Sequence, residues 1–230
     1  MGENLRTEHE LDFKLDYKKQ YKDLYMPKAK PSIIDVPAMS FIMVDGKGNP
    51  NDNEGEYKKA VELLYALSYT IKMSKLSKHK PNGYFEFVVP PLEGLWWLND
   101  DSSDDFSKKD KYCWTSMIRQ PEFVTPDVFA WACQEISIKK PLLDFTKARY
   151  EIFTEGLCVQ MMHLGPFDEE WKTNAQIDSF IESNNLQSAI SDQQPDGRIR
   201  RHHEIYLSDP RKINPQKMKT VLRHPVKTKV

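Results

Sequence analysis

TSMIRQP (Thr115–Pro121) and KTVLRHP (Lys219–Pro225) are two versions of one seven-residue pattern in the same chain. In each stretch, two apolar residues precede an arginine (Arg119 or Arg223), a polar residue and a proline. Both stretches are typical of a strand that ends in Arg-x-Pro. The pattern therefore raises the hypothesis that one folding unit is used twice, and the residues around it test that hypothesis.

Two further landmarks keep the same order and nearly the same spacing in both halves. Glu86 follows Gly46 by 40 residues, and Glu204 follows Gly165 by 39. The arginine comes 33 residues after Glu86 but 19 after Glu204, so the first half has a 14-residue excess in a tryptophan-containing loop. We infer three parts: an N-terminal extension (1–30), a first repeat with the loop insertion and a linking helix (31–140), and a second repeat (141–230).

Hydrophobic periodicity predicts strand–helix–strand–strand in each repeat. Helical patterns begin at Glu56 in the first half and near Pro166 in the second, and Thr125 before Pro126 is typical of the start of the linking helix. We expect residues 148–156 and 157–165 to form a hairpin that turns at Glu155–Gly156. The other predicted strands are 40–45, 84–89, 111–120, 202–209 and 217–225, and residues 91–112 are predicted to form a loop.

One such unit has too small a sheet to bury its own face, whereas two units joined together do. The predicted fold class is therefore α+β, with duplicated units that form one curved antiparallel sheet, helices on one face and a ligand cleft on the other. Side chains alternate along a strand. Ile205 and Leu207 would pack on the helices, and His202, Glu204 and Tyr206 would face the cleft. In the first half, Tyr84 and Glu86 would face the cleft in the same way.

Composition excludes several classes of protein. Net charge is −1 and the sequence pI is about 6.6, so no surplus of cations exists to bind nucleic acid. No apolar run is long enough to cross a bilayer, and the polar start is not a secretory signal. The three cysteines are odd in number and lie among apolar residues, which is typical of reduced thiols in a cytoplasmic protein. We expect no metal and no cofactor, and the sequence leaves the oligomeric state open.

The second half carries GPF (Gly165–Phe167) and EIYLSDP (Glu204–Pro210), and with these motifs the chain resembles the GyrI-like small-molecule-binding family. The likeness covers roughly residues 30–230 as architecture. It implies a cleft at the seam between the repeats that holds flat, often cationic aromatic ligands by stacking and through one buried glutamate, here Glu204. Because no DNA-binding module fits before residue 30, the chain resembles a stand-alone form of the family.

PPLEGLWWLNDDSSDD (90–105) and KYCWTSMIRQPEF (111–123) are similar to a catalytic GyrI-like branch. Members of that branch use an aromatic cage to hydrolyse cyclopropane-bearing DNA-alkylating natural products of the yatakemycin and CC-1065 kind. The resemblance implies a cage and a ligand site at Trp96, Trp97, Trp114 and Tyr206, with Tyr65, Tyr112, Trp131, Trp171 and Glu86 as further ligand-binding candidates.

Water addition to a cyclopropane needs a base and a group that stabilises the developing oxyanion. A carboxylate desolvated beside aromatic rings is such a base. We assign this role to Glu204, with Tyr206 as its neighbour and Glu155 as a second acidic candidate.

Each assignment has an alternative. Glu204 could belong to an ordinary ion pair at the rim, tryptophans commonly pack in cores or lids, and Trp96 and Trp97 must point in different directions on an extended chain. Arg119 and Arg223 are expected to fix strand ends. The same cleft could serve a non-catalytic protein that binds or sequesters such compounds, or the chain could be a scaffold that binds a protein partner.

Overall fold

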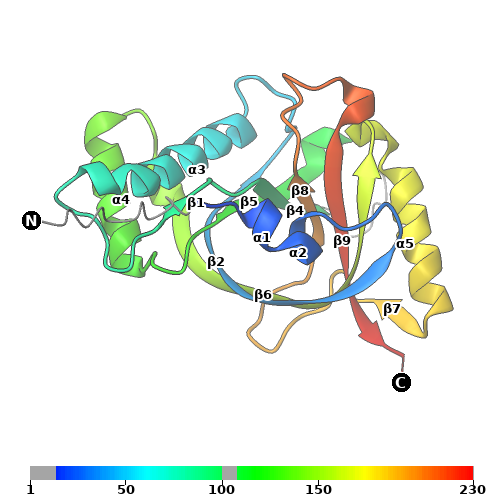
Figure 1. Ribbon diagram of the computed structural model, residues 1–230. Helices are drawn as coiled ribbons and strands as arrows, with labels where there is room; N and C mark the ends of the chain where they lie inside the picture. Colours follow the sequence, from blue (N-terminus) through cyan, green and yellow to red (C-terminus); the bar gives the residue numbers. More distant parts are fainter. Residues whose placement is uncertain (1–13, 100–107, 230) are drawn as a thin grey trace, which may run out of the picture.

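A large antiparallel sheet organises the computed structural model, which describes residues 14–99 and 108–229 (Figure 1). Strands follow the order β6-β2-β5-β4-β8-β9, and β9 pairs back with β6, so that the sheet curves into a ring. The strands of this sheet are β2 (Ser32–Lys47), β4 (Leu92–Leu98), β5 (Tyr112–Arg119), β6 (Ala148–Leu164), β8 (His202–Tyr206) and β9 (Lys219–Thr228), with the short β7 (Leu186–Ser188) beside β9.

The order of elements repeats along the chain. The series β2–α3–β4–β5, with α3 at Glu56–Lys72, is followed by β6–α5–β8–β9, with α5 at Trp171–Ser183. Helix α4 (Pro126–Lys139) lies between the two series, and the Thr125 side chain caps it by accepting a hydrogen bond from the Val128 N–H, as predicted. The predicted mixed fold with one curved antiparallel sheet and helices is confirmed. The boundaries of the two repeats remain a proposal.

Helix α3 packs through a stripe of buried residues spaced three and four apart, which is the pattern that buries one face of a helix. The stripe consists of Ala60, Leu63, Leu64, Leu67, Ser68 and Ile71. Helix α5 buries a narrower stripe made of Thr173, Ile177 and Ile181. The remaining helical turns are the 3-10 segments η1 (Met73–Leu76), η2 (Lys109–Lys111), η3 (Phe145–Lys147), η4 (Phe167–Glu169) and η5 (Pro215–Lys217).

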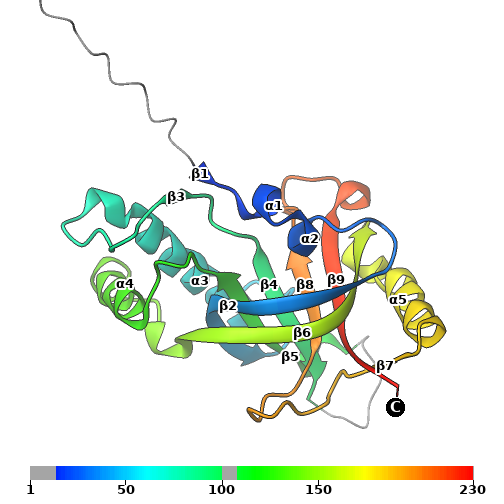
Figure 2. The same ribbon diagram turned by 60° about the horizontal axis from the view of Figure 1, so that its bottom comes forward.

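The predicted hairpin at Glu155–Gly156 is wrong. Strand β6 runs through this point without reversing, and it pairs with β2 from Ala148 as far as Gln160. Gly156 has a φ of 74°, a conformation that glycine adopts without a steric penalty. Gly156, which suggested a turn, therefore accommodates a local change of backbone conformation within a long strand. Strands β2 and β6 curve together (Figure 2).

The predicted strand at 84–89 and the predicted loop at 91–112 are corrected together. Only Glu86–Phe87 (β3) is extended, and β3 pairs in parallel with β1 (Lys14–Leu15), outside the large sheet. The first-half strand that pairs with β8 is β4, which lies within the predicted loop. Glu86 is thus not the structural counterpart of Glu204, since Gly94 of β4 lies opposite Glu204.

The concave side of the sheet is filled by part of the N-terminal segment. Helices α1 (Tyr17–Gln20) and α2 (Lys22–Tyr25) lie within the curve that β2 and β6 form (Figure 1). Tyr17 and Tyr25 are almost fully buried there. The Arg119 guanidinium lies 4.6 Å from the Tyr17 ring centroid, a cation–π contact that holds the end of β5.

Four buried charged residues on this concave side form an inner charge cluster, which we define as Glu93, Glu155, His203 and Arg223. The His203 Nδ1 lies 3.0 Å from Glu155 Oε2, and its Nε2 lies 3.0 Å from Glu93 Oε2. Arg223 donates to the same Glu155 oxygen at 2.9 Å and to the Leu24 carbonyl at 2.9 Å. Arg223 therefore ties β9 to α2 and has the structural role expected from the sequence.

Candidate functional site

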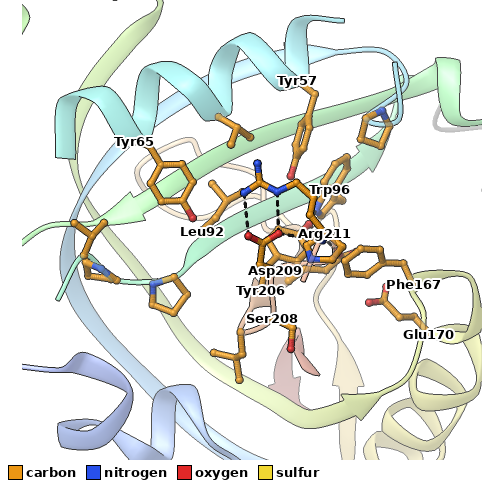
Figure 3. Close-up of a pocket in the computed structure, with 18 of the residues that line it drawn as sticks. Tyr57, Tyr65, Leu92, Trp96, Phe167, Glu170, Tyr206, Ser208, Asp209 and Arg211 are labelled. Atoms are coloured by element: carbon orange, nitrogen blue, oxygen red, sulfur yellow. Dashed lines mark hydrogen bonds and ion pairs between the residues drawn. The ribbon is translucent and has the colours of Figure 1, made fainter. Parts of the chain in front are cut away.

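A cavity of about 610 Å³ lies beside β4 and β8, between α3 and the segment that leads into α5 (Figure 3). Side chains alternate between the two faces of β8. Glu204 and Tyr206 therefore line the cavity, whereas His203 lies on the other face and belongs to the inner charge cluster. The cleft was expected on the sheet face away from the helices. It lies instead on a face that α3 covers in part, since Tyr57, Val61, Tyr65 and Tyr69 of α3 form one of its walls.

An indole and a phenol meet on the floor of the cavity. Trp96 Nε1 donates a hydrogen bond to the Tyr206 hydroxyl at 2.8 Å, between residues that are 110 positions apart in the sequence. Gly94 makes this approach possible, because a Cβ at that position would lie 2.6 Å from Trp96 Nε1 and 3.2 Å from the Tyr206 oxygen. The absence of a side chain at Gly94 leaves the room in which Trp96 meets Tyr206.

A second aromatic layer supports the floor. Trp114 is fully buried, and Tyr57 stands edge-on to it with ring centroids 5.2 Å apart. The Tyr57 ring also lies 5.4 Å from that of Trp96, and Tyr112 lies 5.8 Å from Trp96 on another side. These contacts hold the Trp96 ring in place, which favours stacking of a flat ligand against a rigid surface.

The Glu204 carboxylate is held at both oxygens. Tyr206 donates its hydroxyl hydrogen to Glu204 Oε2 at 2.7 Å, and His202 Nε2 lies 3.3 Å from Oε1. The Glu204 side chain is 15% exposed, so it faces the cavity and not bulk solvent. Trp96, Tyr206 and Glu204 thus form one hydrogen-bonded row, with the negative charge at its end.

The phenol of Tyr206 in this row and the neighbouring phenol of Tyr57 stay protonated at neutral pH. Burial and then the charge of Glu204 raise the pKa of Tyr206 well above its ordinary value. The same two causes, in the same order, raise the pKa of Tyr57. Each phenol is therefore a hydrogen-bond donor and not a source of negative charge.

The wall opposite α3 comes from η4 and the start of α5. The Phe167 ring meets the Tyr206 ring edge-on at 5.8 Å, and Glu170 lies next to Phe167 (Figure 3). Burial, and next the charge of Glu204, raise the pKa of the Glu170 carboxyl well above its ordinary value. Sequence reasoning assigned neither Phe167 nor Glu170 to the site, although Phe167 belongs to the GPF motif and Glu170 follows shortly after it.

Two ion pairs line the cavity. Asp209 and Arg211 form a bidentate pair with two contacts of 2.9 Å (Figure 3). Lys109 and Asp168 form a second pair at 3.1 Å. Among the described residues, no group of three or more His, Cys, Asp or Glu side chains could hold a metal ion, and no helix is long and apolar enough to span a membrane.

The structure separates the candidate residues into two sets. Those that line the cavity are Glu204, Tyr206, Trp96, Tyr65 and Tyr112. Those that lie elsewhere are Trp97, Trp114, Trp131, Trp171, Glu86 and Glu155.

Each residue of the second set has another environment. Trp97 lies under the Arg201 guanidinium, Trp131 beside His79, and Trp171 is exposed on α5.

The two acidic candidates outside the cavity have partners of their own. Glu86 pairs with Lys75 at the surface. Glu155 belongs to the inner charge cluster, where burial would raise its pKa but His203 and Arg223 outweigh burial and lower the pKa to about 2. Glu155 is therefore a buried, permanently charged partner and not a base at the cavity.

Comparisons with known proteins agree with this architecture. Residues 29–227 match the GyrI-like small molecule binding domain. The crystal structure of an uncharacterized conserved protein from Listeria innocua is 52% identical and has a TM-score of 0.85; the match covers 93% of this chain and 100% of that one.

Two further crystal structures, both described as hydrolases from Listeria innocua, are similarly close. One is 51% identical with a TM-score of 0.81, and the match covers 93% of this chain and 100% of that one. The other is 50% identical with a TM-score of 0.82, and the match covers 94% and 100%. A search of curated proteins returned no match.

Proposed function

This chain belongs to the GyrI-like small-molecule-binding family, and from that premise we propose that its cavity binds flat aromatic molecules and hydrolyses those that carry a strained cyclopropane ring. The observation that carries the proposal is the row Trp96–Tyr206–Glu204 on the floor of an aromatic cavity. The description of two relatives at 50% and 51% identity as hydrolases supports a catalytic role.

The aromatic walls supply binding. Each well-placed ring contact contributes about 0.5–1.5 kcal/mol beyond the burial of apolar area. Tyr57 and Tyr112 present rings to the Trp96 indole, and Tyr65 also lines the cavity, so a planar polycyclic ligand gains several such contacts at once. The negative charge of Glu204 at the floor favours ligands with a cationic or electron-poor region.

Glu204 supplies the base. Water adds its oxygen to the strained ring carbon, the carbon–carbon bond of the cyclopropane breaks, and its electron pair moves through the conjugated ring to the carbonyl oxygen. Glu204 accepts the proton that the attacking water loses. Positioned general bases typically contribute about 10²–10⁴ in rate. The reaction removes the alkylating centre, so it would detoxify a DNA-alkylating compound inside the cell.

The test is incubation of the protein with a cyclopropapyrroloindole compound, followed by mass spectrometry of the product. We expect the ring-opened hydrate, with a mass greater by one water, and a rate about 10²–10⁴ lower in Glu204→Gln. Glu169→Gln is a matched control, because Glu169 is a surface carboxylate paired with Lys172. An absence of hydrate with the wild-type protein, or an unchanged rate in Glu204→Gln, contradicts the proposal.

Non-catalytic sequestration is the second candidate function. It is favoured by one observation: both oxygens of Glu204 already have partners, in Tyr206 and His202. In that case the compound quenches tryptophan fluorescence saturably and is recovered with its mass unchanged.

A further inference from the structure

Glu170 is the most deeply buried of the acidic side chains that line the cavity. It is 8% exposed and lines the cavity together with Glu204. Although it occupies the N-cap position of α5, its side chain makes no capping hydrogen bond there. Its Oε1 is buried without a hydrogen-bond partner among the described residues. A buried polar atom left in this way costs about 1–3 kcal/mol unless a ligand satisfies it.

The surroundings of Glu170 disfavour a second negative charge. Glu204 and Tyr206 face it from β8, Asp168 from η4 and Tyr112 from β5. Lys109 pairs with Asp168 and offsets part of that charge. Two features favour an ionised carboxylate, namely the helix dipole at the start of α5 and the side chain of Thr220 on β9. Burial and the charge of Glu204 outweigh them, and the pKa of Glu170 is raised. Burial and the nearby charge of Glu204 thus favour the protonated form of the Glu170 carboxyl group.

We propose that Glu170 is the proton donor of the cavity and gives its proton to the carbonyl oxygen of the bound molecule, while Glu204 accepts the proton of the attacking water. This inference rests on the proposed hydrolysis and deepens it, because it assigns the acid that protonates the carbonyl oxygen in that reaction.

The step balances without any further reactant. Water forms a carbon–oxygen bond at the ring carbon and loses one proton to Glu204. The broken carbon–carbon bond delivers its electron pair to the conjugated carbonyl, which becomes a phenolate oxygen and takes the proton of Glu170. Glu204 ends protonated and Glu170 ionised, and exchange with solvent restores the starting state. The net change is the addition of one water molecule.

The phenols of the cavity are poorer donors of this proton. The Tyr206 hydroxyl hydrogen is already directed to Glu204, and the Tyr206 oxygen accepts from Trp96. The pKa values of Tyr206 and Tyr57 are both raised by burial and by Glu204, which makes either phenol a weak acid at neutral pH. Proton transfer is most effective when the pKa of the donor is near the working pH, a condition that a carboxyl group with a raised pKa meets better.

The kinetic test compares wild type with Glu170→Gln and with the neighbouring control Glu169→Gln, using a cyclopropapyrroloindole compound over a range of pH. We expect Glu170→Gln to lower kcat by about 10²–10⁴ and to change KM little, because glutamine keeps the shape and the hydrogen-bond donor but transfers no proton. In the wild type and in the control, kcat falls as pH rises through the pKa of Glu170; in Glu170→Gln this alkaline fall is absent. If the wild type forms hydrate and Glu170→Gln does so at the same rate with the same pH profile, the inference is overturned and the proposed function stands.

A second measurement decides the inference if the wild-type protein forms no hydrate, an outcome that by itself refutes the proposed function. Affinities for fluorenone and for fluorene, the same flat ring system without the carbonyl group, are measured in wild type and in Glu170→Met. A preference for fluorenone that weakens with rising pH and disappears in Glu170→Met supports Glu170 as donor to a carbonyl oxygen. An equal preference in both proteins overturns it.

Discussion

The inner charge cluster makes the stability of this protein depend on pH in a direction that the structure fixes. Burial alone would lower the pKa of His203, but Glu155 and Glu93 beside it outweigh burial and raise the pKa to about 9. Its two ring nitrogens each lie 3.0 Å from a carboxylate oxygen, so the imidazole carries two protons and a positive charge in the folded state. In the unfolded chain it titrates near 6.5.

The magnitude follows from the difference between these two values. A group with a higher pKa in the folded state contributes stability that is fully present below pH 6.5 and is lost as pH rises through about 9. At 1.36 kcal/mol for each pKa unit, the loss for His203 is about 3 kcal/mol. Replacement by glutamine removes the titration and leaves Glu93 and Glu155 short of one positive charge. Breaking a buried ion pair in this way costs about 3–5 kcal/mol.

The assay is denaturant unfolding of wild type, His203→Gln and His79→Gln at intervals from pH 6 to pH 10. His79 is exposed, so His79→Gln controls for the loss of an ordinary histidine. We expect the free energy of unfolding of wild type and of the control to fall by about 3 kcal/mol more than that of His203→Gln over this range. If the three curves run parallel, His203 is not a charged member of the cluster and the reasoning is refuted.

Two further predictions concern the floor of the cavity. In Gly94→Ala the new Cβ would lie 2.6 Å from Trp96 Nε1, so we expect the indole to shift and the free energy of unfolding to fall by about 1–3 kcal/mol. We also expect fluorescence titrations to show a lower affinity for flat aromatic ligands. Unchanged affinity and stability contradict the close approach of Gly94 and Trp96. Tyr206→Phe keeps the ring but leaves the Trp96 N–H and one Glu204 oxygen without a partner. We therefore expect denaturant unfolding to show a free energy of unfolding lower by about 1–3 kcal/mol. An unfolding curve that matches that of wild type rules out the hydrogen-bonded row in solution.

Local signals in the sequence predicted the elements whose pattern is complete within a few residues. Thr125 before Pro126 predicted a capped helix, and the structure shows that cap. The same local reading failed at Glu155–Gly156, because a glycine that ends a strand and one that lets a long strand change direction look alike in sequence. It also failed at Trp96, where a strand was taken for a loop, since only pairing with β5 and β8 shows that this segment is extended.

The candidate site divides in the same way. The period of two along β8 determined from sequence alone that Glu204 and Tyr206 share a face, and the structure adds the hydrogen bond between them. Alternation along a strand does not say which face of the sheet borders a cavity. The prediction that the cleft lies on the face away from the helices was therefore wrong. Glu155 and Glu170 show the same limit. Glu155 was predicted to lie at a turn but is buried among charges, whereas Glu170, to which the sequence analysis gave no role, lines the cavity.

The amino-acid sequence by itself determined the long helices, the recurrence of one order of elements and the pairing of an acid with a phenol on β8, because each of these depends on neighbours along the chain. Only the tertiary structure decided that Trp96 reaches Tyr206, that His203 lies between two carboxylates and that Glu170 shares a cavity with Glu204. The physical reason is that burial, the room left by Gly94 and the electrostatic coupling of two carboxyl groups depend on distances between segments far apart in the sequence.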